Sequence, residues 1–267
     1  MVFFAGCDVG SLTSKAVIMK NGKIVAGAII KSRPRPKDSA NEVMAEALKI
    51  AAIGQNDISF CVGTGYGRDK IDFVDESISE ITCHGKGAGW LLPSARTVID
   101  IGGQDCKAMK IDENGAVTRF MTNDKCASGT GRFLEVMARV LGVGIDQLGK
   151  LSLTGKSPIM LASTCTVWAQ ADVIKYINSG VPIADIGAGV NAAMAARVAI
   201  LINAVKPEGD ILMTGGVAKN IGVVSTLEKL LGKRIKNARK ADPQIAGAIG
   251  AALLAWEKEK AREREVV

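Results

Sequence analysis

Two cysteines, Cys126 and Cys165, lie where a thiolate could do chemistry. Cys126 stands among turn-forming residues in the run Asn123-Asp-Lys-Cys-Ala-Ser-Gly-Thr-Gly131, and apolar residues at helical spacing follow from Phe133 to Leu141. A sulfur just before a helix faces unpaired backbone N–H groups and the positive end of the helix dipole. Both features favour the thiolate over the thiol. The pattern therefore predicts a charged sulfur at the start of a helix.

Cys165 repeats this arrangement. It precedes a second apolar stripe at helical spacing, which consists of Val167, Ala171, Ile174 and Ile177. From spacing alone, two interpretations of the two cysteines stay open. They could be small packing residues, which the absence of a C-x-x-C pair favours. They could also be two ligands of a [4Fe–4S] cluster, whose usual four thiolates would come from a two-fold symmetric dimer.

The other four cysteines are interpreted as structural. Cys7 and Cys61 fall in predicted strands, Cys106 in a turn, and Cys83 at a helix start beside the only histidine, His84. Adjacent residues on a helix do not face each other, so packing is favoured over a ligand pair. A chain of this size without a secretory leader usually keeps its thiols reduced. We therefore expect a cytoplasmic protein.

Two turns rich in Asp, Gly, Ser, Thr and Lys could hold a phosphate. Asp8-Val-Gly-Ser-Leu-Thr-Ser-Lys15 and Asp100-Ile-Gly-Gly-Gln-Asp-Cys-Lys107 share Asp-x-Gly, then four residues, then Lys. An apolar segment and an Asn-Gly pair follow each turn, at Asn21-Gly22 and Asn114-Gly115. This order of matches favours an internal duplication, with one copy in each of two domains, over a chance likeness of two hairpins.

The two turns predict a nucleotide site that contains Mg²⁺. Backbone N–H groups and hydroxyls of such turns converge on one space and can hold a polyphosphate. Asp8 and Asp100 are placed to hold Mg²⁺ through water, because this ion prefers oxygen ligands and stays hydrated. Lys15 would neutralise a phosphate, and Gln104 or Asp105 would orient the attacking water. The predicted site residues of the turns are Asp8, Ser11, Leu12, Thr13, Ser14, Lys15, Asp100, Gly102, Gly103, Gln104, Asp105 and Lys107.

A glycine pair predicts the place of the adenosine. Gly215 and Gly216 end an apolar strand and leave room for a flat ring, with Ala218 beside them. In this order and spacing, the motifs resemble the actin, sugar-kinase and heat-shock-protein ATPase superfamily. The resemblance implies an α/β fold of duplicated actin-like, ribonuclease H-like domains with a nucleotide cleft between them. It implies a first domain of residues 1–95 plus 246–267, and a second of 96–245 that carries the cysteines and the adenosine motif.

The segments around the two cysteines resemble one family within this superfamily. Asn123–Glu135 and Ser163–Val167 are similar to the activator, or component A, of 2-hydroxyacyl-CoA dehydratases and to the ATPase subunits of benzoyl-CoA reductase. The likeness extends to Gly63–Arg68, Glu80–His84 and the region of Gln244, which joins the nucleotide-binding set. A modest departure is Leu12, where small residues are common in relatives.

The family resemblance implies a function. Cys126 and Cys165 would hold one [4Fe–4S] cluster per homodimer. An electron from ferredoxin or flavodoxin would pass, with ATP hydrolysis, to an iron–sulfur dehydratase or reductase in anaerobic metabolism. The alternative on the same scaffold is a small-molecule kinase, for example of an amino sugar, with Asp105 as its catalytic carboxylate. A polymerising actin-like protein is a third class, which the short chain disfavours.

The remaining pattern predicts the elements that carry these residues. A strand begins at Phe3, and a helix over 38–53 takes Asp38 or Ser39 as its cap. The other predicted elements are a strand over 58–62, helices over 183–205 and 221–231, strands over 209–218 and 234–238, and a last helix over 243–256 whose charged tail, 257–265, is a solvated helix end.

Composition excludes several other classes. The 267 residues are 48% hydrophobic and 23% charged, as expected of a well-cored protein. The net charge of +7 is dispersed and only 4% of residues are aromatic, which disfavours nucleic-acid binding. No uninterrupted apolar run approaches the ~18 residues of a membrane span, so no membrane is expected.

Overall fold

The computed structural model describes residues 2–123, 126–163 and 165–265. The chain forms two compact units. The first comprises Met1–Ala95, Ile111–Thr118 and Ala238–Val267, and the second comprises Arg96–Lys110 and Arg119–Asn237. Two segments, 111–118 and 238–245, therefore lie with the first unit, whereas we expected both in the second domain. The reason is local: the hairpin tip at Gly115 packs on the helix that carries Gly85, and Gln244 bonds to Thr13.

The first unit contains a five-stranded sheet in the order β3-β2-β1-β4-β5. Its strands are β1 (Phe3–Val9), β2 (Thr13–Lys20), β3 (Lys23–Lys31), β4 (Ile58–Thr64) and β5 (Glu76–Ser77). β2 runs antiparallel to both β1 and β3, and β4 runs parallel to β1. Because β1 is the middle strand, its C-terminal end is flanked by β2 and β4 and does not lie at an edge of the sheet.

Both predicted Asn-Gly turns are confirmed. Asn21 and Gly22 join β2 to β3 with φ of 51° and 72°, as a two-residue hairpin turn with two positive φ values requires. In the second turn Gly115 has φ of 78°, and the Asp112 carboxylate accepts hydrogen bonds from the N–H groups of Asn114 and Ala116.

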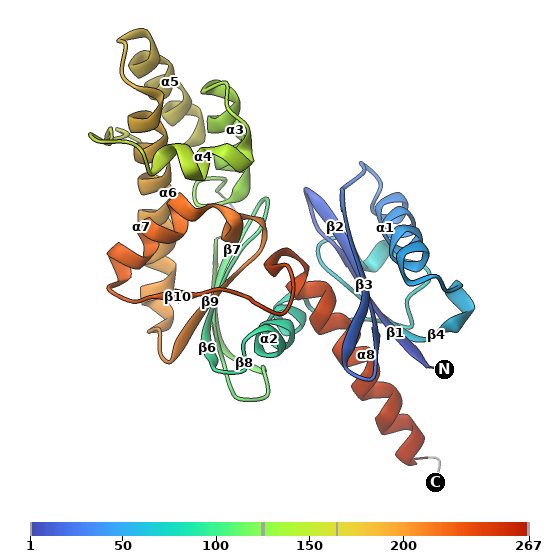
Figure 1. The fold of residues 1–267 in the computed structure, drawn as a ribbon. Helices are drawn as coiled ribbons and strands as arrows, with labels where there is room; N and C mark the ends of the chain where they lie inside the picture. Colours follow the sequence, from blue (N-terminus) through green and yellow to red (C-terminus); the bar gives the residue numbers. More distant parts are fainter. Residues whose placement is uncertain (1, 124–125, 164, 266–267) are drawn as a thin grey trace. The chain divides into compact units, whose positions relative to one another are not determined.

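Helices cover both faces of the first sheet (Figure 1). α1 (Pro36–Ala51) packs its Val43 and Ala47 on the face formed by Ala5, Cys7 and Val9. α8 (Ala246–Glu265) and α2 (Glu80–Leu91) pack on the other face, around Phe4 and Phe60. The side chains of β1 alternate between the two faces because successive residues of a strand point to opposite sides of the sheet.

The predicted start of α1 is wrong. The helix begins at Pro36, with Arg35 at the N-cap, two residues before Asp38. Proline is favoured in the first turn because its missing N–H is unpaired there anyway and its φ already suits a helix. Asp38 instead pairs with Arg35, and the Ser39 hydroxyl accepts from the N–H of Arg33.

The second unit repeats the sheet, in the order β10-β9-β6-β7-β8. Its strands are β6 (Ala95–Ile101), β7 (Cys106–Ile111), β8 (Val117–Asn123), β9 (Asp210–Thr214) and β10 (Ile235–Lys236). β6 pairs antiparallel with β7, as β1 does with β2. The corresponding aspartate and lysine are register partners in both hairpins, Asp8 with Lys15 and Asp100 with Lys107. This matching register supports the duplication.

The described part of the second unit also contains five α-helices, which Figure 1 labels. They are α3 (Gly131–Val140), α4 (Ile145–Ser152), α5 (Thr166–Asn178), α6 (Ile183–Val205) and α7 (Ile221–Leu231). The predicted spans of α6 and α7 are confirmed. α6 forms the centre of the core through Val190, Met194, Val198 and Ile202.

By length and composition, α6 is the one described helix that could cross a membrane. Half of its most apolar stretch is buried within the protein. A core helix passes the same test, so this feature is weak evidence for a membrane span.

Glycines allow α2 and α8 to pack backbone against backbone. A side chain at Gly250 of α8 would place its Cβ 1.8 Å from the carbonyl oxygen of Cys83, and one at Gly87 of α2 would lie 1.9 Å from that of Ala246. A Cβ at Gly6 of β1 would lie 2.1 Å from the carbonyl oxygen of Ala248. The close spacing of α2, α8 and β1 therefore depends on glycine at these positions.

We predict that Gly250→Ala destabilises the protein by about 1–3 kcal/mol, the usual cost of overpacking. In an open helix the same change would stabilise by about 1 kcal/mol, so the sign separates the two cases. Denaturant unfolding measures the difference. Gly54→Ala is the matched control, because its Cβ would lie 3.5 Å from Asp57, an ordinary contact. A Gly250→Ala protein as stable as the control would contradict the backbone packing.

Candidate nucleotide and thiol sites

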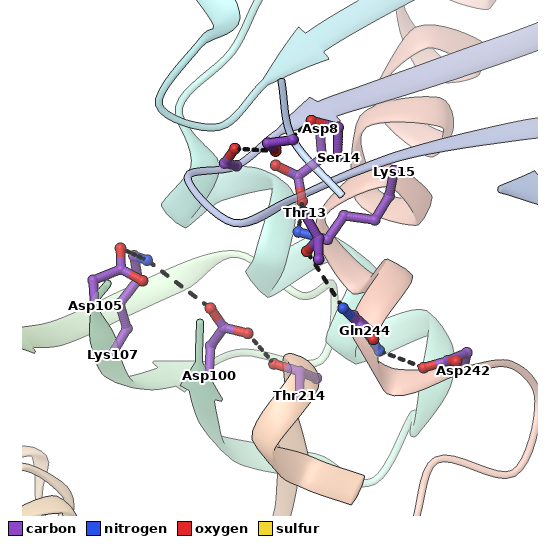
Figure 2. Close-up of polar contacts among 12 residues, drawn as sticks. Asp8, Thr13, Ser14, Lys15, Asp100, Asp105, Lys107, Thr214, Asp242 and Gln244 are labelled. Carbon is purple, nitrogen blue, oxygen red and sulfur yellow. Dashed lines mark hydrogen bonds and ion pairs between the residues drawn. The ribbon is translucent and has the colours of Figure 1, made fainter. Parts of the chain in front are cut away.

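The first turn joins β1 to β2 and holds a buried ion pair (Figure 2). Asp8 is 3% exposed, and Nζ of Lys15 lies 3.2 Å from its Oδ2. Two glycines make room for the carboxylate. A Cβ at Gly65 would lie 2.5 Å from Oδ1, and one at Gly247 would lie 3.0 Å from Oδ2. Asp8 is thus held in one place, with a cation on one side.

Hydroxyl groups order the rest of this turn. Ser14 is buried, and its Oγ lies 2.9 Å from that of Ser32, which donates to the carbonyl of Gly10 at 2.7 Å. Gln244 donates through Nε2 to Thr13 Oγ1 at 3.3 Å, and the Asp242 carboxylate accepts from its N–H (Figure 2). Ser11 and Leu12, at the tip, are half-buried. Gln244 therefore belongs with the first turn.

The second turn holds its lysine more tightly than the first. Asp100 is 2% exposed and accepts a hydrogen bond of 2.8 Å from the Thr214 hydroxyl. Lys107 contacts the Asp105 carboxylate and lies 3.9 Å from that of Asp100 (Figure 2). Gln104 is exposed. Of the two side chains predicted to orient water, Asp105 is thus engaged with Lys107, whereas Gln104 faces solvent.

The adenosine motif follows β9 in a conformation that needs glycine. Gly215 has φ of 81°, and a Cβ there would lie 2.3 Å from the carbonyl oxygen of Ile101. Gly216 is exposed and Ala218 is half-buried, in a short 3₁₀ helix, Gly216–Lys219. Gly215 is thus required by the close approach of the end of β6, and the place of the adenosine stays a prediction.

A buried polar network behind this motif was not predicted. Asn220 caps α7 by accepting from Gly222 and Val223, each at 3.0 Å. Asn191 of α6 reaches Asn220 and donates to Ser152 Oγ at 2.7 Å. An Asn before an apolar helix is a readable cap signal, but its partner on α6 depends on the tertiary structure.

Cys126 lies farther from its helix than expected. α3 begins at Gly131 with Thr130 as N-cap, so four residues separate the cysteine from the helix. Its Sγ lies 3.0 Å from Ser128 Oγ. The pKa of Cys126 is lowered, first by hydrogen bonding to Ser128 and then by the positive charge of Arg197. The predicted thiolate is therefore favoured by these two side chains, which sequence analysis missed.

Cys165 is exposed and is itself the N-cap of α5. Its N–H donates to Ser163 Oγ at 3.1 Å. Asp124, Lys125 and Thr164, which belong to the two cysteine motifs, lie outside the described residues.

Much of the predicted apolar stripe after Cys165 faces outward. Val167 and Ile174 are 70% and 44% exposed, as is the neighbouring Trp168 at 66%, whereas Ile177 packs against the core of the unit. The buried side of α5 consists instead of Ala169 and Val173.

The other four cysteines are buried, which agrees with a structural role. Burial raises the pKa of Cys61 and of Cys83 to about 12, and it also raises those of Cys7 and Cys106. Only Cys126 and Cys165 of the six thiols are open to solvent. The two residues predicted as ligands are therefore the two that could reach a metal.

Main-chain hydrogen bonds join the second turn to the cysteine segment. The carbonyl of Gly102 accepts from the N–H of Gly131 at 2.8 Å, and that of Gly103 accepts from Arg132 at 2.9 Å. A Cβ at Gly131 would lie 3.0 Å from the Gly102 oxygen. A displacement of this turn would therefore shift the start of α3, to which it is hydrogen-bonded.

The donor set of one chain suits half of a four-thiolate cluster. No group of three or more His, Cys, Asp or Glu side chains that could hold a metal occurs in the part of the chain that the structure describes. Two accessible thiols, one with a lowered pKa, fit a cluster completed by two further thiolates.

Comparison with known proteins gives close matches over the whole chain. A model of the BadF/BadG/BcrA/BcrD ATPase family matches residues 5–255. The activator of lactoyl-CoA dehydratase from Anaerotignum propionicum is 43% identical over 256 residues, which cover 96% of this chain and 98% of that protein. One of the benzoyl-CoA reductase subunits of Thauera aromatica is 34% identical over 262 residues, with 95% and 93% covered.

Solved structures confirm the predicted fold class. The activator of the 2-hydroxyisocaproyl-CoA dehydratase from Clostridium difficile, with bound ADPNP, has a TM-score of 0.94 at 39% identity and covers 99% of this chain and 98% of its own. A ROK family glucokinase from Streptomyces griseus has a TM-score of 0.58 at 15% identity, with 96% and 99% covered. The second likeness shows the fold alone.

We expect only Cys126 and Cys165 to be alkylated by iodoacetamide in iron-depleted, folded protein near pH 7.5. Cys126 should react faster than an unperturbed cysteine, because a lowered pKa raises its thiolate fraction at this pH. Peptide mapping by mass spectrometry measures the rates. Unfolded protein is the control, in which all six cysteines should react. Early labelling of Cys61 or Cys83 in the native state would contradict the observed burial.

Proposed function

Because this chain belongs to the BadF/BadG/BcrA/BcrD ATPase family, we propose that it is an ATPase that activates a 2-hydroxyacyl-CoA dehydratase or a benzoyl-CoA reductase by electron transfer. The chain would act as a homodimer that receives electrons from ferredoxin or flavodoxin. The observation that carries the proposal is that one chain contains both the two Asp-x-Gly turns, residues 8–15 and 100–107, and two solvent-accessible thiols.

The turns would bind Mg²⁺ and ATP. Asp8 and Asp100 are each buried within their own unit, and their carboxylate oxygens are the kind of ligand that suits a hydrated Mg²⁺. Lys15 would compensate phosphate charge, and Gln104 has the exposure needed to orient a water molecule. The adenosine would lie at Gly215–Ala218. The relative's bound ADPNP supports a nucleotide site in this scaffold.

The thiols would hold the electron carrier. Cys126 and Cys165 of each protomer would together supply four thiolates to one [4Fe–4S] cluster, which when bound supplies one-electron transfer at low potential. Ser128 and Arg197 favour the charged form of Cys126 that a metal requires.

The link between the sites would be the main-chain contact of Gly102 and Gly103 with the start of α3. A change at the phosphate turn would shift these carbonyls and, through two hydrogen bonds, the segment that follows Cys126. ATP hydrolysis would in this way alter the surroundings of the sulfur. Two packed elements joined by backbone hydrogen bonds move together more readily than flexible side chains would.

The deciding experiment is purification without oxygen. We expect about four iron atoms per dimer and electron transfer to a dehydratase or reductase partner that requires ATP. Cys165→Ala should lose the iron and the electron transfer while it keeps its folded structure, because the side chain is exposed. Ser179→Ala, at the other end of α5, is the control. An iron-free wild-type protein, or electron transfer by Cys165→Ala, would refute the proposal.

The kinase alternative can be tested with the same protein. ATP-dependent phosphorylation of a sugar or amino sugar by iron-free protein would favour it, since a phosphotransferase needs no cluster.

Asp8→Asn should reduce ATP hydrolysis about 10²–10³-fold, as expected when one preorganised charge is removed from a phosphoryl-transfer site. A phosphate-release assay at saturating Mg²⁺ measures this. The iron content should not change, because Asp8 and the two accessible cysteines lie in different units. Asp69→Asn, an exposed aspartate of the same unit, should behave like wild type. If Asp8→Asn hydrolyses ATP at the wild-type rate, the first turn is not the catalytic site.

A further inference from the structure

A positively charged side chain packs against the turn after Cys126. Arg197 belongs to α6 and is half-buried. A Cβ added at Gly129, whose φ is 89°, would lie 3.2 Å from its Cγ and 3.6 Å from its Cβ. Arg197 therefore brings a positive charge to the turn that contains Ser128 and follows Cys126.

Ser128 completes the surroundings of the sulfur. It is 2% exposed, and its Oγ lies 3.0 Å from Sγ of Cys126. The Asn123 side chain fixes the turn by donating to the carbonyls of Cys126 and Ser128, at 3.2 Å and 3.0 Å. The hydroxyl is thus held in contact with the sulfur rather than free to rotate into solvent.

We propose that Ser128 and Arg197 are positioning residues that orient the Cys126 sulfur and set the reduction potential of a cluster bound there. The inference rests on the proposed function. Reduction adds a negative charge to the cluster, and a hydrogen bond to a ligand sulfur or a nearby positive charge stabilises that state. Both residues therefore raise the potential.

The test is a redox titration, monitored by EPR, of protein purified without oxygen. Arg197→Gln and Ser128→Ala should each make the midpoint potential more negative. A tenfold weaker reduction equilibrium corresponds to about 59 mV for one electron. Arg197→Lys, which keeps the charge, should retain most of the wild-type potential. Arg139→Gln removes an exposed arginine from α3 of the same unit and should leave the potential unchanged.

Iron analysis and thermal unfolding accompany each titration. Loss of iron from folded Arg197→Gln, with iron retained in Arg197→Lys and Arg139→Gln, would also support the positioning role. Equal potentials in wild type, Arg197→Gln and Ser128→Ala would overturn the inference, as would an equal shift in Arg139→Gln. Both outcomes leave the proposed function intact, because the cluster is present. Iron-free wild-type protein would instead overturn the proposed function and this inference with it.

Discussion

A carboxylate buried at the end of a central strand is the constraint on which each unit depends. Asp8 and Asp100 end β1 and β6 with almost no exposure, and a buried charge is costly unless it is paired. The hairpin solves this problem in both units, because its return strand places a lysine in register with the aspartate. In the second unit Asp105 adds a further carboxylate, so Lys107 is shared. The duplicated motif is therefore a duplicated charge pair.

Glycine is the second requirement, because the main chain must pass close to these groups. Gly65 and Gly247 leave space for the Asp8 carboxylate, and Gly215 for the end of β6. The same property brings Gly131 against the carbonyl of Gly102, so the turn of residues 102–105 and the segment that follows Cys126 are joined by main-chain hydrogen bonds. The absence of side chains at these positions thus allows the two segments to pack directly against each other.

Local pattern predicted the elements well where local forces decide them. A continuous apolar run placed the strand that begins at Phe3, and the spacing of small and apolar residues gave α6 and α7 their observed limits. The Asn-Gly pairs predicted both turns, since few other residues tolerate positive φ. The start of α1 was missed because Pro36, already compatible with helical φ, competes successfully with Asp38 and Ser39 as the first signal.

The sequence by itself determined the chemical groups: two Asp-x-Gly turns with their lysines, a glycine pair after a strand, and two cysteines set before helices. These are local signals, and each depends on neighbours within a few residues. Only the tertiary structure decided that the Asp105 carboxylate pairs with Lys107, and that Arg197, 71 positions after Cys126, packs against the turn that follows it. It also turned Val167 and Ile174 outward, since the period of a stripe marks one face of a helix but does not say what that face contacts. Contacts between distant segments follow from packing, which no local pattern records.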